Sequence, residues 1–471
     1  MRSTWLGFGL GLFTLIGCNA LWQGYLSPID DPVDGAIVDL SDVDLTGEPP
    51  PDLTGADLTG VPDVDMTKPK LCGFAPGASG VSKYNSYSQL FSIPGYSPTR
   101  LAVADIDNDG IADVAVSDQS TTVKIWYGQL SGATCTYSTT NNCLITGTNG
   151  SPSVFDIAGF TVNPTTGPGA FLIARNSTNT GAVGSCSQRT ATFKPYTNPL
   201  FSSTSSRKEI NVPRLKAVTN GIFTLFEKGT DATGDRVNSV KLNSTLDLES
   251  VVTVASHGNL LSPQYEPRNA TGIRVNTNNS DGILDVATFE VGTTNAGRVR
   301  VYNNNHIASP PANPFNVTIS PAGSSDLFAD LNRVISGRLT NDENDDLLAI
   351  VQLTGQVVPF LVSTGGGINQ LSPFTVPGGT SLASRNNVIL EDTNEDGIDE
   401  LIVFNGQNVV IHSFNGTTFV NAKSLSVTSG YTIDAIAVGY LEASHSSKSA
   451  DIFVLSHKNT SYEVGVFRYD Q

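Results

Sequence analysis

An acidic loop in this chain has the residue types and the spacing of a cation-binding site. Its carboxylates stand at the first, third, fifth and ninth positions: Asp105, Asp107, Asp109 and Asp113. Calcium takes roughly six to eight hard oxygen ligands, and a tight loop that presents oxygens at alternate positions can surround it. Gly110 permits the sharp turn, and the backbone carbonyl of Ile111 completes the set at the seventh position. The spacing therefore predicts a calcium site in this loop.

Three further copies of the loop follow, with fewer acidic ligands. The second copy keeps the spacing and loses one negative charge: Asp392, Asn394, Asp396, the carbonyl of Ile398, and Glu400. The third copy begins at Thr277 and offers the side chains of Asn279, Asp281 and Asp285. The fourth copy begins with a cationic residue, Arg338, and we expect no metal there. Affinity in such loops rises with ligand charge, so the first loop is expected to bind calcium most tightly.

These loops also fit a simpler interpretation, in which Asp and Asn side chains bond their own backbone in polar turns. An EF-hand is a third interpretation, but it needs a helix on either side and a Glu at the twelfth position. The apolar residues on both sides of the first loop alternate with period two, which is typical of strands. The EF-hand is therefore excluded, while the calcium loop and the polar turn both stay open.

The acidic loops belong to a unit that recurs from residue 72 onward. Each unit has an apolar strand, a polar loop, a second apolar strand and a third strand, as in residues 101–104, 114–116 and 122–127. The loop copies begin at Asp105, Gly159, Val218, Thr277, Arg338, Asp392 and Tyr440, with spacings from 48 to 61 residues. Seven copies with this period predict an all-β, seven-bladed β-propeller, because solenoid repeats are usually shorter. The copies at Gly159, Val218 and Tyr440 lack the acidic pattern.

The two ends of the repeat region predict how the ring of blades closes. The last copy stops just after its third strand, which leaves its blade one strand short. Residues 82–94 precede the first copy and have strand character. An unpaired sheet edge is a liability that a closed ring removes. We therefore expect residues 82–94 to complete the last blade.

The N-terminal segment has the pattern of an export signal. The apolar run 5–16, about a dozen residues, is too short for a membrane-spanning helix and has the size of a signal-peptide core. Leu15-Ile16-Gly17-Cys18 resembles a bacterial lipobox, in which the cysteine is lipidated. The alternative is an ordinary secretory signal with an incidental cysteine. We expect residues 1–17 to be removed and Cys18 to provide the sole membrane contact, at the outer membrane or surface of a bacterial cell.

Residues 18–70 are expected to form a disordered tether between the lipid anchor and a propeller at 71–471. The sequence Asp-Leu-Thr-Gly recurs at 44–47, 52–55 and 57–60, and the 11 acidic residues of 21–70 face only two lysines. A segment so acidic and so poor in bulky apolar residues cannot offset its ordering entropy. The net charge of the whole chain, −17, argues against a nucleic-acid partner, because such binding needs a basic surface.

Four cysteines remain after Cys18, and an even number in an exported chain suggests two disulfides. Cys135 and Cys143 flank a short polar segment that could close a loop, which leaves Cys72 for Cys186. A zinc site is the alternative, although neither a Cys-x-x-Cys motif nor a nearby His supports it. We expect the pairs Cys135–Cys143 and Cys72–Cys186.

Together, these loops and strands resemble the FG-GAP or VCBS repeat, which builds the seven-bladed propeller of integrin alpha subunits. The resemblance covers about residues 72–471 and is strong over 101–127, 270–303, 333–362 and 387–414. It implies that the acidic loops join the first two strands of a blade and bind calcium structurally, while other loops recognise partners. It implies calcium ligands at Asp105, Asp107, Asp109 and Asp113, and at Asp392, Asn394, Asp396 and Glu400.

Two functional hypotheses follow from this resemblance and from the residues. The first is a cell-surface binding or adhesion module for a protein or glycan ligand, in which calcium stiffens the blades and no reaction is catalysed. The second is a carbohydrate-active propeller enzyme, a lyase or hydrolase. The five histidines are scattered outside any known catalytic motif, and His412 is expected to be a packed or surface residue. Carboxylate pairs for glycoside chemistry are spatial, so the sequence favours the first hypothesis without excluding the second.

Overall fold

The computed structural model describes residues of one of the two units into which the chain divides. These units are Met1–Asp65 and Met66–Gln471, and every described residue belongs to the second. The described residues are 84, 86–118, 122–131, 134–137, 143–146, 154–161, 169–175, 179–184, 192–197, 207–212, 221–228, 235–256, 265–275, 284–292, 297–302, 314–315, 331–351, 355–363, 367–377, 382, 387–442 and 450–469. The predicted signal peptide, the lipidation site Cys18 and the predicted tether lie outside them.

Antiparallel pairing groups the described strands into seven sheets of four or five strands, which we number along the chain from the first acidic loop. Sheet 1 holds β2 (Arg100–Ala104), β3 (Asp113–Ser117), β4 (Thr122–Trp126) and β7 (Cys143–Thr146). Sheet 2 holds β8 (Val154–Thr161), β9 (Gly169–Arg175), β10 (Asn179–Gly184) and β11 (Thr192–Thr197). Sheet 3 holds β12 (Arg207–Asn211), β13 (Ile222–Lys228), β14 (Arg236–Leu242) and β15 (Leu248–Ser256).

The later sheets repeat the same order. Sheet 4 holds β16 (Tyr265–Ile273), β17 (Asp285–Gly292), β18 (Gly297–Tyr302) and β19 (Pro314–Phe315). Sheet 5 holds β20 (Leu331–Gly337), β21 (Asp346–Val351), β22 (Gln356–Val362), β23 (Ile368–Gln370) and β24 (Phe374–Thr375). Sheet 6 holds β25 (Val388–Glu391), β26 (Glu400–Asn405), β27 (Asn408–Phe414) and β28 (Phe419–Ser426). Sheet 7 holds β29 (Thr432–Gly439), β30 (Asp451–Lys458), β31 (Ser461–Phe467) and β1 (Ser88–Ile93), and a hairpin of β5 (Gly128–Ser131) and β6 (Thr134–Tyr137) stands apart.

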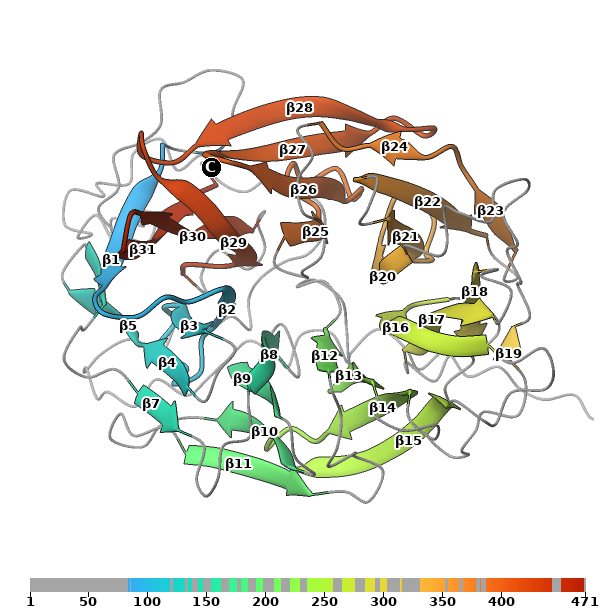
Figure 1. Cartoon of the computed structure of the whole chain (residues 1–471), viewed down its shortest axis with the longest axis horizontal. Coiled ribbons are helices and arrows are strands. Elements are labelled where there is room, and N and C mark those ends of the chain that lie inside the picture. The colour runs from blue at the N-terminus through green and yellow to red at the C-terminus, as the bar shows by residue number, and fades with distance from the viewer. Residues whose placement is uncertain are drawn as a thin grey trace, which may run out of the picture. The chain divides into compact units, whose positions relative to one another are not determined.

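The sheets follow one another around a ring, with the first strand of each repeat towards the middle (Figure 1). Contacts between first strands run from β2 to β8, β12, β16, β20, β25 and β29, and then from β29 back to β2. Radial repetition of short antiparallel sheets around a centre is the architecture of a propeller. The predicted all-β propeller fold is confirmed.

The ring closes by pairing the two ends of the repeat region, as the sequence predicted. Strand β1 pairs antiparallel with β31, with Ser88 opposite Val466 and Ile93 opposite Tyr462. An isolated bridge joins Tyr84 to Tyr469 beyond the end of β1. Sheet 7 therefore takes its outermost strand from the start of the repeat region and its other three strands from the end.

The apolar side chains of the strands are buried between neighbouring sheets. Between sheets 1 and 7, for example, Val114 packs in one cluster with Phe453 and Val464. The second strands β3 and β21 are buried along their whole length, because they lie inside a sheet that is covered on both faces. No helix among the described residues has the length and hydropathy that a membrane span needs.

One of the predicted loop positions is wrong. Gly159, which we expected to begin a loop, lies inside β8. A Cβ at this position would stand 1.9 Å from the backbone oxygen of Val103 in β2, so the glycine allows two sheets to approach closely. The expected loop starts Val218 and Thr277 lie outside the described residues, while Asp105, Arg338, Asp392 and Tyr440 each directly follow the first strand of a sheet.

Candidate cation-binding loops

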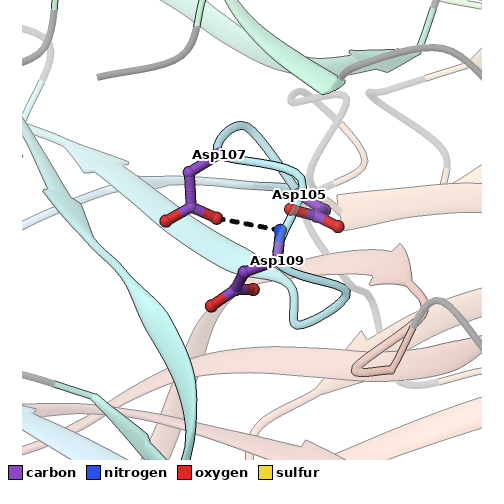
Figure 2. Close-up of side chains that lie close together, drawn as sticks. All are labelled: Asp105, Asp107 and Asp109. Atoms are coloured by element: carbon purple, nitrogen blue, oxygen red, sulfur yellow. Dashed lines mark hydrogen bonds between the residues drawn. The ribbon is translucent and has the colours of Figure 1, made fainter. Parts of the chain in front are cut away.

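The first acidic loop joins β2 to β3 and brings three of its carboxylates together. Asp105, Asp107 and Asp109 each offer one oxygen, and these oxygens all lie within 4.8 Å of one another. Figure 2 shows the three side chains on the same tight turn. Asp105 and Asp107 are partly buried and Asp109 is exposed, so the group lies at the protein surface.

Backbone N–H groups hold this turn. Three carboxylates each accept one such bond: Asp105 from Gly110 at 2.9 Å, Asp107 from Asp109 at 3.3 Å, and Asp109 from Ile111 at 2.9 Å. Asn108 and Gly110 have left-handed φ angles of 58° and 87°. The glycine at the sixth position is needed because other side chains are strained there. The polar turns of the simpler interpretation are therefore present.

A carboxylate oxygen that the turn leaves unused favours the cation interpretation as well. Oδ1 of Asp105 is buried and accepts no hydrogen bond from any described residue. Burial raises the pKa of Asp105, and the charge of Asp107 raises it further. A buried anionic oxygen without a partner costs free energy, and a cation would offset that cost. Because carboxylate and carbonyl oxygens are the ligands that calcium prefers, these residues fit that ion.

The fourth predicted acidic ligand, Asp113, is engaged elsewhere. Its side chain is fully buried at the start of β3 and is not part of the three-carboxylate group. Its two oxygens accept the N–H groups of Ile106 and Gly128, both at 2.9 Å. Burial raises the pKa of Asp113 to about 8. Asp113 thus ties the loop to the end of the third strand.

The second acidic loop, between β25 and β26, has the same backbone conformation as the first. Glu395 and Gly397 have left-handed φ angles of 66° and 85° at the fourth and sixth positions. Asp392 accepts the N–H of Gly397 at 3.2 Å, and Asp396 accepts that of Ile398 at 2.8 Å. Two sequences that share the acidic spacing therefore fold into one kind of turn.

The side-chain amide of Asn394 distinguishes the second loop from the first. It donates to Asp396 Oδ2 at 3.0 Å and to Glu400 Oε1 at 2.7 Å. The amide hydrogens thus take up oxygens that a cation would need. Burial raises the pKa of Glu400 to about 7, while bonds from Thr393 act in the opposite direction.

The other two loops hold fewer predicted ligands within the described residues. Asn279 and Asp281 lie outside these residues, and Asp285 is buried at the start of β17. In the Arg338 loop, Asp346 accepts the N–H groups of Leu339 and Val362 at 2.8 Å each. Asp346 thus repeats the contacts of Asp113.

Each loop is also bonded to a neighbouring sheet, which the sequence did not reveal. Gly169 in sheet 2 donates to the carbonyl of Asp105 at 2.9 Å, and Ala112 donates to the carbonyl of Leu441 in sheet 7 at 2.9 Å. The first acidic loop is therefore linked to the sheets on both sides of it. Equivalent bonds run from Asp399 to Arg338 and from Asp345 to Arg274, at 2.6 and 2.8 Å.

The remaining candidate residues are placed as follows. Cys135 lies on β6 and Cys143 on β7, whereas Cys72 and Cys186 are outside the described residues, and the predicted disulfides stay predictions. His412 on β27 is fully buried and packs edge-on against Phe374, with ring centroids 5.2 Å apart. Burial lowers the pKa of His412, as expected for a packed residue.

No family model and no curated protein matches the chain. Among solved structures, BP39L lectin from Burkholderia pseudomallei is 11% identical with a TM-score of 0.48, covering 78% of this chain and 94% of its own. A structure of BBS1N in complex with ARL6DN is 11% identical with a TM-score of 0.44, and the match covers 81% of this chain and 97% of that chain. The Cps50 (Swd1) β-propeller domain from Myceliophteria thermophila is 12% identical with a TM-score of 0.44, and the match covers 80% of this chain and 99% of that domain.

Proposed function

We propose that this protein is a bacterial cell-envelope lipoprotein whose propeller is a calcium-stabilised binding or adhesion module. In this proposal the seven sheets are the seven blades of an FG-GAP type of propeller, and Cys18 carries the lipid. The observation that carries the proposal is the first acidic loop: three carboxylates within 4.8 Å of one another, on a turn bonded to both neighbouring sheets. A cation bound there would stiffen the junction of three sheets.

Acidic side chains near the centre of the ring support a role without catalysis. Asp156 accepts the N–H of Ile210 in the adjacent sheet at 3.0 Å. Glu209 accepts a bond from the amide of Asn269 at 2.6 Å. These carboxylates join first strands to one another, so their hydrogen-bonding capacity serves the ring. The ligand of the module is a protein or a glycan at the cell surface.

One observation favours the second candidate, a carbohydrate-active enzyme. His457 Nδ1 lies 2.6 Å from Asp434 Oδ2, and both side chains are partly exposed, at 30% and 23%. A histidine oriented by a carboxylate is a common general base. The acidic loops lie just before the second strand of each sheet, whereas His457 lies near the far end of the second strand β30. The pair is therefore remote from the acidic loops.

Glycan-array binding and product analysis on the same preparation distinguish the two candidates. The binding module should retain specific glycans or surface proteins in calcium and release no reducing sugar from a panel of polysaccharides. His457→Asn should leave this retention unchanged. Release of sugar that His457→Asn abolishes would contradict the proposal and establish the enzyme.

A further inference from the structure

Three sheets share a buried carboxylate that makes the same two backbone contacts. Asp113, Asp346 and Asp451 each begin the second strand of their sheet and are at most 3% exposed. One oxygen accepts an N–H just after the first strand of the sheet, and the other accepts an N–H at or just beyond the end of the third strand. The donors are Ile106 and Gly128 for Asp113, Leu339 and Val362 for Asp346, and Leu441 and Tyr469 for Asp451, all at 2.8–2.9 Å. We call these three residues the clasp carboxylates.

The clasp is independent of the acidic ligand pattern. Arg338 and Tyr440 occupy the first loop position in sheets 5 and 7, where the predicted calcium loops have an aspartate. Asp346 and Asp451 nevertheless keep both backbone bonds. In each clasp the N–H groups of two segments meet on one buried carboxyl group at the start of a third, so the side chain joins three segments of one sheet.

The partners of Asp451 lie at the seam where the ring closes. Its first partner, Leu441, accepts the N–H of Ala112 in sheet 1 at 2.9 Å. Its second partner, Tyr469, forms the bridge to Tyr84 next to the closing strand β1. The rings of Tyr84 and Tyr469 also meet edge to face, with centroids 5.4 Å apart. Asp451 therefore contacts one segment that is bonded to sheet 1 and another that is bridged to the chain just before β1.

We propose that Asp451 is the residue that locks the ring closed, by holding Leu441 against sheet 1 and Tyr469 against the N-terminal segment. The lock acts on chain closure and requires no bound cation. Asp346 makes the same bonds inside sheet 5, away from the seam, and is a matched control. Asparagine at either position keeps one acceptor oxygen and turns an N–H donor towards the second backbone N–H, so one of the two bonds is lost.

Hydrogen–deuterium exchange of the full chain tests this lock, with Asp451→Asn and Asp346→Asn measured both in calcium and in chelator. Loss of a buried bond should speed exchange about tenfold or more in the segments that it held. For Asp451→Asn, faster exchange is expected in residues 88–93 and 108–112, both with and without calcium. For Asp346→Asn exchange should rise in residues 339–362 and stay at the wild-type level in 88–93.

The proposal is overturned if Asp451→Asn exchanges residues 88–93 like wild type, or if both variants open these residues equally. It is also overturned if the effect of Asp451→Asn appears only in calcium. Should Asp451→Asn yield no folded protein, Asp451→Glu keeps the charge and shifts the oxygens by one methylene. The same segments are then compared, with the same two outcomes.

Discussion

Phe91 on the closing strand β1 offers a quantitative test of how the ring is held shut. Its side chain is 5% exposed. It stacks on Trp126 of sheet 1 at 4.9 Å between ring centroids and lies 5.1 Å from Tyr137 of the β5–β6 hairpin. A strand that precedes the first repeat thus packs against sheet 1 while it pairs with sheet 7.

Truncation of Phe91 to alanine should therefore destabilise the whole propeller. A buried aromatic side chain removes about 150–250 Å² from water, which is about 4–6 kcal/mol at about 25 cal/mol per Å². Measured Phe→Ala substitutions in cores cost about 3–5 kcal/mol, and we expect the same range here. Equilibrium unfolding in urea, followed by tryptophan fluorescence and by circular dichroism, measures the loss.

Ser92 is the matched control, because it is exposed on the same strand. Ser92→Ala should change the free energy of unfolding by less than about 0.5 kcal/mol. If Phe91→Ala unfolds no more easily than Ser92→Ala, β1 does not contribute to the closed ring in solution. The stacking of Phe91 on Trp126 would then contribute nothing measurable to the free energy of unfolding.

Two further predictions concern pH and the N-terminus. Burial raises the pKa of Asp346 to about 6, so the folded state binds this proton more tightly than the unfolded chain, and the contribution of Asp346 to stability grows as pH falls from 7 towards 4. In urea unfolding with chelator, the stability of wild type relative to Asp346→Asn should rise over that range, and a constant difference would refute the shift. An alkyne fatty acid should label the wild-type chain and miss Cys18→Ala, whereas equal labelling would refute the lipid anchor.

Period-two alternation and the repeat spacing were sufficient to predict the all-β propeller, the first three strands of sheet 1 and the closure of the ring. The acidic spacing alone also located the two turns, because Gly110 and Gly397 stand where a left-handed φ is needed. Gly159 was misassigned because the repeat spacing placed a loop start there, and a glycine fits a turn as well as a close approach of two strands. Only the position of Val103 on a neighbouring sheet distinguishes the two.

The clasp at Asp451 escaped sequence analysis because its loop is longer. Asp451 follows Tyr440 by eleven residues, whereas Asp113 follows Asp105 by eight. A template with fixed spacing passes over such an insertion, although the backbone bonds are the same. The amide of Asn394 is a similar case: the sequence predicted an oxygen ligand, and the hydrogen bonds reveal that its nitrogen competes for the neighbouring carboxylates.

Thermal melting with and without calcium tests the central claim most directly. A ligand that binds only the folded state at a hundredfold excess over Kd stabilises it by about 2.7 kcal/mol. We predict that calcium raises the wild-type midpoint above its value in chelator, and does so more than magnesium. The rise should shrink in Asp109→Ala and shrink less in Asp396→Ala. A wild-type midpoint that calcium leaves unmoved, or a rise that neither substitution reduces, would contradict the account and leave the loops as polar turns.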